Sequence, residues 1–312
     1  LNMVTCPQFT GEEDMSGLKA NLEHLETICI DSCTDLTNKG FVQLLSIAGS
    51  RLKRLHLSRS KLNDLLVAEL VPSQYVLQVL QLSHCPQLSN KGLLGLLNTL
   101  GRNLVNLDLS NTKISGEGFV ESGIKLESLQ ILKLGCCSSV TDQGLSELVN
   151  ITGGHLKELY LPGVRTIVGQ GLAASNLPLK RLQVLDLSGC DEVTNQWMWD
   201  TQCLGTESLN LGFALHRDHW RGICYAKSKN GKKQVLNLDH CPMLTNQGLL
   251  EMISCMGSNL KELYLDYTNI TGEGFVEDNP RLDSLQILSV RGCSGSDWIR
   301  QMCNRPNICI KL

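Results

Sequence analysis

The sequence has no long uninterrupted run of apolar residues. No stretch reaches the roughly 18 consecutive apolar residues that a membrane-spanning helix needs. The first twenty residues also lack the basic start and the apolar centre of an export signal. We therefore expect neither a membrane span nor an export signal within these residues.

An excess of charge of one sign is absent too. The chain contains 28 Lys and Arg residues and 31 Asp and Glu residues, which gives a formal net charge of −3. Nucleic acids and anionic membranes attract proteins mainly through basic surfaces. Neither is therefore expected to be the main partner of this chain.

Motifs of catalysis and nucleotide binding are also missing. The chain has no Gly-x-Gly-x-x-Gly after a strand, no Gly-x-x-x-x-Gly-Lys-Ser/Thr, no His-Glu-x-x-His and no Gly-x-Ser-x-Gly. Gly-Glu-Gly occurs at 116–118 and again at 272–274, in two segments that match each other. A repeated structural unit explains that recurrence, so we expect no enzymatic activity, no catalytic residue and no cofactor.

Cysteine, by contrast, recurs at a regular spacing. Six cysteines each close a segment of the form Leu-x-x-Leu-x-Leu-x-x-Cys or close to it, and the intervals between them are 52, 52, 53, 51 and 52 residues: Cys33, Cys85, Cys137, Cys190, Cys241 and Cys293. Midway between them the leucine spacing returns with a smaller residue in the cysteine position, as at Ser60 and Thr112. A period of about 26 residues with this pattern is typical of a leucine-rich-repeat solenoid. We therefore predict an α/β fold, a curved solenoid with parallel strands on the concave face and helices on the convex face.

The residues after each odd strand predict where the helices begin. Thr37, Ser89, Thr141 and Thr245 are placed to cap a helix, and apolar residues follow each of them at helical spacing. In the even units, the glycines of Gly-Glu-Gly predict a short or irregular helix.

Repeats that run from end to end predict one domain, residues 1–312. We expect about thirteen strand units, centred near residues 2, 29, 56, 81, 108, 133, 160, 186, 210, 237, 264, 289 and 309. Neither end shows the polar capping repeat that usually protects a solenoid core. The chain is therefore expected to belong to a longer protein.

The repeat geometry also predicts that the regularly spaced cysteines are unpaired. Strands lie about 4.8 Å apart, so cysteines two repeats apart are separated by roughly 10 Å, beyond the ~7 Å limit for a disulfide. We expect reduced, buried thiols that bond a neighbouring backbone carbonyl, and hence a cytoplasmic or nuclear protein. Two glycosylation sequons, at Asn150 and Asn269, favour the alternative of an extracellular protein.

The units Cys-x-x-Leu-Thr-x-x-Gly-Leu resemble the cysteine-containing leucine-rich repeats of F-box substrate receptors. The alternation of two repeat types is also similar to ribonuclease-inhibitor-like repeats, including those of nucleotide-binding immune sensors. The resemblance covers nearly the whole chain and implies a protein partner on the concave face. F-box relatives contact a ubiquitin-ligase adaptor through a helical motif before the repeats. No such motif is visible here, so that contact would need residues outside this chain.

Strand alternation sends the residues between the leucines to the concave face. The central column runs from Cys29 to Cys309, and part of the face combines aromatic and acidic residues. Tyrosine is enriched at binding hot spots, and carboxylates suit a basic segment of a partner. A plain solvated strand face is the alternative. The residues predicted to bind the partner are Asp108, Lys133, Tyr160, Asp186, Phe213, Asp239, Tyr264, Asp266 and Tyr267.

The repeat pattern breaks at about 197–233. This stretch contains Trp197, Trp199 and Trp220 and a basic run at 227–233. It is either a protruding loop that grips a partner or a degenerate repeat whose tryptophans fill the space of missing leucines. It also contains residue types that zinc accepts, at a spacing unlike the familiar zinc sites: Cys203, His216, His219 and Cys224. We expect no metal site there.

The sequence as a whole indicates a protein-recognition module. The interpretation favoured by the resemblance is the substrate-binding part of a ubiquitin-ligase receptor. A ligand-sensing array of an immune or regulatory receptor and a free-standing enzyme inhibitor are the alternatives.

Overall fold

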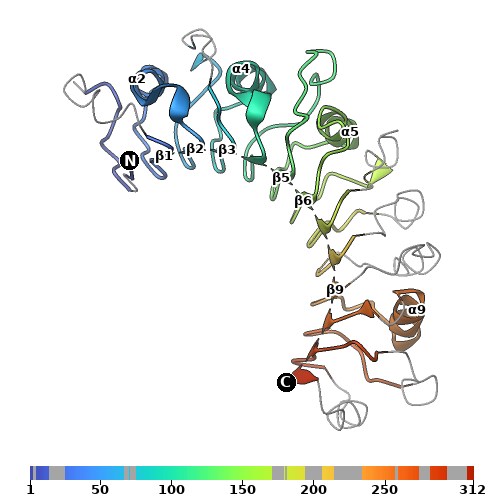
Figure 1. The fold of residues 1–312 in the computed structure, drawn as a ribbon. Helices are drawn as coiled ribbons and strands as arrows, with labels where there is room; N and C mark the ends of the chain where they lie inside the picture. The colour runs from blue at the N-terminus through green and yellow to red at the C-terminus, as the bar shows by residue number, and fades with distance from the viewer. Residues whose placement is uncertain are drawn as a thin grey trace. The chain divides into compact units, whose positions relative to one another are not determined.

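Short parallel strands of three residues recur along the chain (Figure 1). Twelve of the expected strand centres lie in strands, and the expected centre near residue 2 is a single bridge from Asn2 to Cys29. The strands are β1 (Thr27–Cys29), β2 (Arg54–His56), β3 (Val79–Gln81), β4 (Asn106–Asp108), β5 (Ile131–Lys133), β6 (Glu158–Tyr160), β7 (Val184–Asp186), β8 (Ser208–Asn210), β9 (Val235–Asn237), β10 (Glu262–Tyr264), β11 (Ile287–Ser289) and β12 (Cys309–Lys311).

The residues form two compact units, Leu1–Leu156 (unit 1) and Lys157–Leu312 (unit 2). Unit 1 holds β1 to β5 and unit 2 holds β6 to β12. The number of folding domains stays a prediction. The computed structural model describes residues 1–2, 5–13, 25–66, 70, 75–170, 179, 181–193, 206–213, 234–256, 259–273, 282–293 and 308–312.

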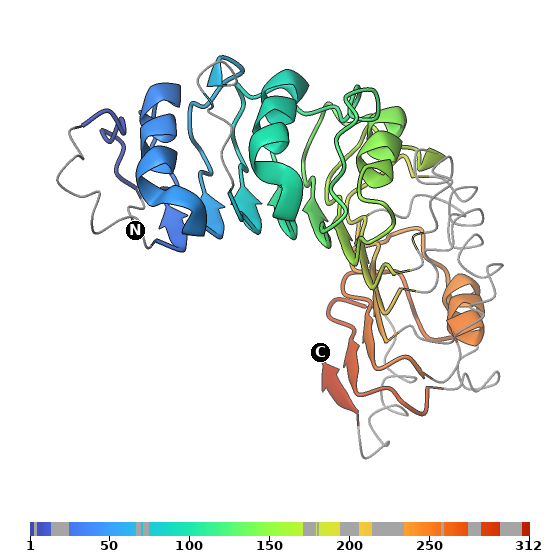
Figure 2. The ribbon, with the colours of Figure 1, turned by 45° about the horizontal axis from the view of Figure 1, so that its top comes forward.

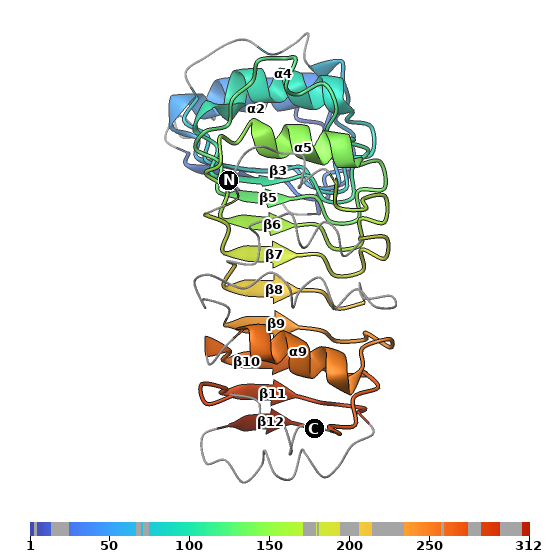
Figure 3. The same cartoon turned by 90° about the vertical axis from the view of Figure 1, so that its right-hand side faces the viewer.

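Within each unit, strands that follow one another in sequence are neighbours in the sheet. The middle residue of each strand is aligned with the middle residue of the next, as in the pairs Leu55–Leu80 and Leu80–Leu107. These middle leucines are at most 1% exposed, whereas the flanking residues face the other side of the sheet. Figure 3 shows the strands of unit 2 as successive parallel rungs. The leucine pattern thus sets both the core side and the register.

Helices lie on the side of the sheet that the leucines face (Figure 2). They are α2 (Asn38–Ala48), α4 (Asn90–Leu100) and α5 (Asp142–Asn150) in unit 1 and α9 (Asn246–Met256) in unit 2, with 3₁₀ turns η2 (Gly49–Arg51) and η3 (Gly101–Asn103) after α2 and α4. The predicted caps are confirmed, because the hydroxyl oxygens of Thr37, Ser89, Thr141 and Thr245 accept backbone N–H groups of the first turns. The predicted α/β solenoid is confirmed in both units.

In α2 and α5, a glycine in the first turn allows close approach to the preceding repeat. A Cβ atom at Gly144 would overlap the carbonyl oxygen of Ser115, and one at Gly40 would overlap that of Thr10. The glycine in Thr-Asn-x-Gly is therefore a packing requirement and not a helix signal.

The asparagine of the same motif binds the next repeat. Asn90 donates from Nδ2 to the Ser115 hydroxyl at 2.7 Å and accepts the Ser115 backbone N–H at 3.0 Å. Asn246 makes the same pair of bonds with Thr271, at 2.7 and 3.0 Å. The bound segment after Ser115 consists of turns, with Gly116 at φ 87° and Gly118 at φ 83°. The predicted irregular helix of this even unit is thus a chain of turns.

The cysteine and threonine positions alternate because they share an acceptor. The buried carbonyl of Leu109 accepts the Thr112 hydroxyl at 2.6 Å and the Cys137 thiol of the next repeat at 3.1 Å. In unit 2, the carbonyl of Leu265 accepts the Thr268 hydroxyl and the Cys293 thiol in the same way, at 2.7 and 3.0 Å. The predicted bond from a regularly spaced thiol to a carbonyl is thereby confirmed. We call the positions of the regularly spaced cysteines, and the equivalent positions midway between them, the ladder positions.

The same bond recurs at Cys85, Cys190 and Cys241. Burial raises the pKa of the Cys190 thiol to about 12 and raises the pKa of Cys85 and Cys137 as well. These groups stay protonated at neutral pH, which is the form that can donate. None of the described cysteines forms a disulfide.

Gly144→Ala tests the close approach of neighbouring repeats. Helix propensity alone favours alanine by about 1 kcal/mol. We expect the overlap with the Ser115 carbonyl to reverse that sign and to lower the free energy of unfolding by more than ~2 kcal/mol. Denaturant unfolding measures the change, with Gln143→Ala in the same turn as the control. A Gly144→Ala variant as stable as the parent would contradict the role of this glycine.

Cys137→Ala tests the thiol ladder, and its exposed neighbour supplies the control. Cys137 is fully buried and bonded to Leu109, whereas Cys136 is exposed. The Leu109 carbonyl keeps its bond to Thr112, so we expect a loss of about 1–2 kcal/mol for Cys137→Ala, mostly from lost packing. Cys136→Ala should stay within about 0.5 kcal/mol of the parent. Equal unfolding midpoints for the two variants would show that the ladder thiol is dispensable.

Candidate functional site

The predicted partner-binding residues are divided between the two units. Asp108 and Lys133 are aligned neighbours on β4 and β5 of unit 1. The other seven lie in unit 2, where Tyr160 on β6 is aligned with Asp186 on β7. All strand residues among them point to the side opposite the leucine core, as predicted from strand alternation. We call this side the strand face.

One end of the predicted column is wrong. Ser289 is aligned with Lys311, not with Cys309, because Ile310 pairs with Leu288 in the core position. The last strand offers two choices two residues apart, Ile308 with Ile310 or Ile310 with Leu312, and the chain uses the second. A shift of two residues keeps the same face toward the core, so the pattern alone does not distinguish the two registers.

The acidic residues of the strand face also have a structural role. Asp108 and Asp186 each accept the backbone N–H two residues later, both at 2.9 Å. Asp239 accepts the backbone N–H of Asp266 at 2.7 Å, and Asp266 accepts that of Arg291 at 2.9 Å. Such bonds hold the turns that leave the strands. Burial raises the pKa of Asp239, and the nearby Asp266 carboxylate adds to the rise.

Two tyrosines are fixed on the strand face by glutamates of their own strands. Tyr160 donates its hydroxyl to Glu158 at 2.9 Å, and Tyr264 donates to Glu262 at 2.8 Å. Burial and the Glu158 carboxylate raise the pKa of Tyr160 to about 12, and the bond to Glu262, with burial, raises the pKa of Tyr264 to about 12. Both phenols are therefore neutral donors at physiological pH. The ammonium group of Lys311 lies 5.5 Å from the centroid of the Tyr264 ring, so this ring already accepts a cation over its face.

Three rings of unit 2 stack on one another beyond the ends of the strands. The Phe213 and His240 ring centroids are 4.2 Å apart with an interplanar angle of 10°, and those of His240 and Tyr267 are 4.6 Å apart at 20°. Phe213 is 55% exposed and Tyr267 is 58% exposed. We call these three residues the aromatic stack. It is the largest exposed aromatic feature among the described residues.

The turn geometry explains why the rings meet. Phe213, His240 and Tyr267 have φ values of 61°, 55° and 57°, in the left-handed region that bulky residues rarely adopt. Each lies directly before the ladder position of its repeat, and each donates its backbone N–H to the next repeat, at 2.9, 2.7 and 2.7 Å. Identical turns in successive layers point their side chains in the same direction. Phe213 and Tyr267 were among the residues predicted from the sequence, whereas His240 was missed.

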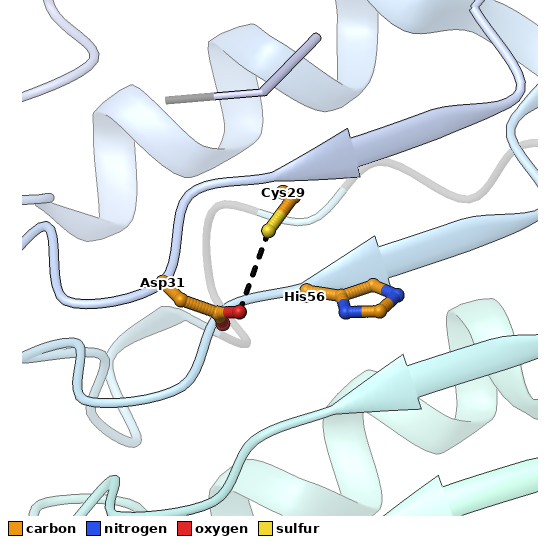
Figure 4. Close-up of side chains that lie close together, drawn as sticks. All are labelled: Cys29, Asp31 and His56. Carbon is orange, nitrogen blue, oxygen red and sulfur yellow. Dashed lines mark hydrogen bonds between the residues drawn. The ribbon is translucent and has the colours of Figure 1, made fainter. Parts of the chain in front are cut away.

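A second cluster lies on the strand face of unit 1 (Figure 4). The thiol of Cys29, the carboxylate of Asp31 and the ring of His56 have donor atoms within 4.8 Å of one another. These are ligand types that zinc accepts. However, Asp31 already accepts the backbone N–H of Ser58 at 2.8 Å and the Cys29 thiol at 3.4 Å. Burial raises the pKa of Cys29 and so disfavours the thiolate that a metal would need. Hydrogen bonding thus accounts for the positions of Cys29 and Asp31.

A shallow hollow of about 590 Å³ lies among the loops of unit 1 beside the start of α2. Its charged side chains pair with one another, Lys39 with Glu12 at 3.2 Å and Lys61 with Asp35 at 2.9 Å. Small-molecule sites are mostly lined by apolar and aromatic side chains, whereas nearly all residues that line this hollow are polar or charged. Within the described part of the chain, no helix has the length and apolar character to cross a membrane.

Several sequence hypotheses fall outside the described residues. They concern the tryptophans Trp197, Trp199 and Trp220, the basic run at 227–233 and the zinc-type residues Cys203, His216, His219 and Cys224. Within the irregular segment 197–233, the structure describes 206–213, which contains β8 and Phe213.

Comparisons with known proteins agree with the repeat architecture. The family model described as "Leucine Rich repeat" matches residues 125–149. A protein of Caenorhabditis elegans, EEED8.10, which is named as a candidate RNA-binding protein, is 28% identical over 255 residues. The match covers 73% of this chain, and the chain spans about a third of that relative, 32% of its length.

One solved structure supports the same fold. The mouse RP105/MD-1 complex contains a chain with 18% identity and a TM-score of 0.50, and the match covers 91% of this chain and 42% of that one. In the yeast Rad7 and Elc1 complex, a chain with 17% identity and a TM-score of 0.48 is matched over 99% of this chain and 80% of its own length. The stacked strands, the spaced leucines and the family match together show that the chain has the leucine-rich-repeat fold.

Proposed function

We propose that this chain is a protein-recognition module whose partner binds to unit 2, on the strand face and the aromatic stack. The exposed stack carries the proposal, because Phe213 and Tyr267 leave more than half of their surfaces in solvent, 55% and 58%. Aromatic residues held in place by their neighbours supply contact area at low entropic cost. Tyr160 and Tyr264 extend this aromatic area along the strand face.

The charge of the surface favours a basic segment of a protein over a nucleic acid. The net charge of the chain is −3, and the strand face of unit 2 carries Asp186, Asp239 and Asp266. Carboxylates repel phosphate groups. The name of EEED8.10 points to RNA, but this chain corresponds to 32% of that protein. Neither a nucleic acid nor a membrane is proposed as the partner of this segment.

The thiol ladder supports a reducing compartment, either the cytoplasm or the nucleus. Thiols donate hydrogen bonds to carbonyls at five described ladder positions, and four of these cysteines are buried. Residues of the two glycosylation sequons also make hydrogen bonds within the fold. Thr152 is fully buried and donates its hydroxyl to Val149 at 2.7 Å, and Asn269 donates its side-chain amide to Pro242 at 2.6 Å. Glycosylation would compete with these contacts, so an extracellular location is disfavoured.

We further propose that the module selects the substrate of a ubiquitin ligase. The support is the resemblance of its Cys-x-x-Leu-Thr-x-x-Gly-Leu units to those of F-box receptors. Contact with an adaptor would then use residues outside this chain. A receptor array of the immune type and a free-standing inhibitor use the same kind of binding face and remain the alternatives. Catalysis within the chain is not proposed.

Replacing both outer rings of the aromatic stack tests this function. In Phe213→Asn/Tyr267→Asn, asparagine tolerates the left-handed backbone, so the substitutions remove ring area without adding strain. Truncation of a hot-spot residue costs about 2 kcal/mol of binding free energy, so the loss of two such residues should lower the amount of captured partner at least tenfold. Quantitative mass spectrometry of proteins captured from cell extract by the parent and by the variant measures the loss.

The control removes exposed apolar side chains elsewhere. Leu65 and Val120 are 72% and 50% exposed in segments that connect strands of unit 1. Leu65→Asn/Val120→Asn should retain the partner. If the control loses the captured proteins and the stack variant keeps them, the stack is not the recognition site. Saturable binding of a single-stranded RNA at physiological salt, lost in the stack variant, would replace the protein partner with RNA.

A further inference from the structure

The two ends of the aromatic stack are closed differently. At one end, a Cβ atom at Gly292 would lie 2.7 Å from Cδ1 of Tyr267, so the tyrosine ring covers the glycine backbone. At the other end, the turn before Phe213 carries Gly189. Among the described residues, a Cβ atom at Gly189 would approach only the backbone of Gly163, at 3.5 and 3.6 Å. The turn at Gly189 thus supplies no side chain to the layer beside Phe213. We call the space above Gly189 in this layer the vacant layer.

The size of this vacant layer follows from the repeat spacing. Parallel strands lie about 4.8 Å apart, and each turn of the stack supplies one planar group per layer. The observed ring spacings of 4.2 and 4.6 Å match that distance. Gly189, at φ 67°, has the same left-handed turn as Phe213, at φ 61°. The space above Gly189 therefore suits one more planar group parallel to the Phe213 ring.

The charges around the vacant layer favour a cation. The face of an aromatic ring is electrically negative, and it attracts Arg or Lys side chains. Asp186 is the last residue of β7, three residues before Gly189, and its carboxylate accepts the backbone N–H of Ser188 at 2.9 Å. A carboxylate has room for further donors. The described strands beside the site, β7, β8 and β9, contain no lysine or arginine, and the guanidinium group of Arg165 in the neighbouring turn is paired with Asp191 at 3.5 Å.

We propose that the vacant layer above Gly189 binds the guanidinium group of an arginine side chain of the partner, stacked on the face of the Phe213 ring opposite His240. This assignment rests on the proposed function and names the chemistry that the partner must offer. A guanidinium group is planar and stacks on a ring, whereas the ammonium of lysine is a compact point charge that prefers its water shell. Arginine therefore matches both the shape and the charge of the site. A nucleobase matches only the shape.

Phe213 itself can report on the binding. The chain has only 5 phenylalanines, so selective isotope labelling of their rings gives an NMR spectrum simple enough to assign. The probes are the N-acetyl, N-methylamide derivatives of arginine, lysine and citrulline. Citrulline is planar like arginine but uncharged. We expect arginine to shift the Phe213 ring signals with a dissociation constant about 3- to 30-fold lower than that of lysine, and citrulline to bind more weakly than arginine.

A variant that fills the vacant layer above Gly189 tests the same site. Gly189→Asn places a side chain above the glycine backbone in a conformation that asparagine tolerates. It should raise the dissociation constant for arginine at least about fivefold, since the site is then occupied. Gly123→Asn, in unit 1 at φ 73°, where a Cβ atom would meet nothing within 4 Å among the described residues, is the control and should leave arginine binding unchanged. Backbone amide spectra that superimpose with the parent show that both variants fold.

The outcomes separate the arginine site from the recognition function. Equal affinities for arginine and lysine, or arginine binding that survives Gly189→Asn, overturn the arginine site. If partner capture nevertheless depends on Phe213 and Tyr267, the recognition function stands without it. If arginine binds as expected but capture is independent of the stack, the recognition function fails and the arginine site stands. Tighter binding of citrulline than of arginine would show a site for planar groups without charge selection.

Discussion

The backbone hydrogen bonds between successive repeats are the interaction on which the rest of the structure depends. They continue past each strand into its exit turn, as when Arg59 donates to Ser83 and His84 donates to Ser110, both at 2.8 Å. Every layer must therefore turn in the same way at the same position. A residue that would be an isolated left-handed outlier elsewhere becomes one member of a column. Columns of equivalent residues from successive repeats therefore organise the surface more than the individual strands do.

The same constraint produces both the core ladder and the exposed stack. One residue after the left-handed position, thiols and hydroxyls share buried carbonyls such as that of Leu109. At the left-handed position itself, side chains project outward in register. In unit 2, this column contains three aromatic residues between glycines, and a binding surface results from adjacent repeats without any added domain. The strand-face aspartates support it by holding the turns, so they combine a structural role with their negative charge.

Much of the fold could be predicted from the sequence, because its determinants are periodic. The leucine spacing located the strands, and Thr or Ser before Asn-x-Gly located the helix starts. His240 was missed because the leucine pattern shows which side of a strand a residue faces, but not the backbone conformation of the turn that follows. The recurrence of ring side chains directly before the ladder position at 213, 240 and 267 was the available signal. The register of β12 was ambiguous because two apolar pairs fit it equally well.

The contact between neighbouring rings of unit 2 in solution is the most direct test of this view. In a sample with isotope-labelled phenylalanine, histidine and tyrosine rings, nuclear Overhauser effects can be measured between their ring protons. Stacked layers predict cross-peaks between Phe213 and His240 and between His240 and Tyr267, in keeping with centroid distances of 4.2 and 4.6 Å. If the Phe213 ring shows contacts with core leucines, or none with His240, the turns do not align their side chains and the proposed binding surface does not exist.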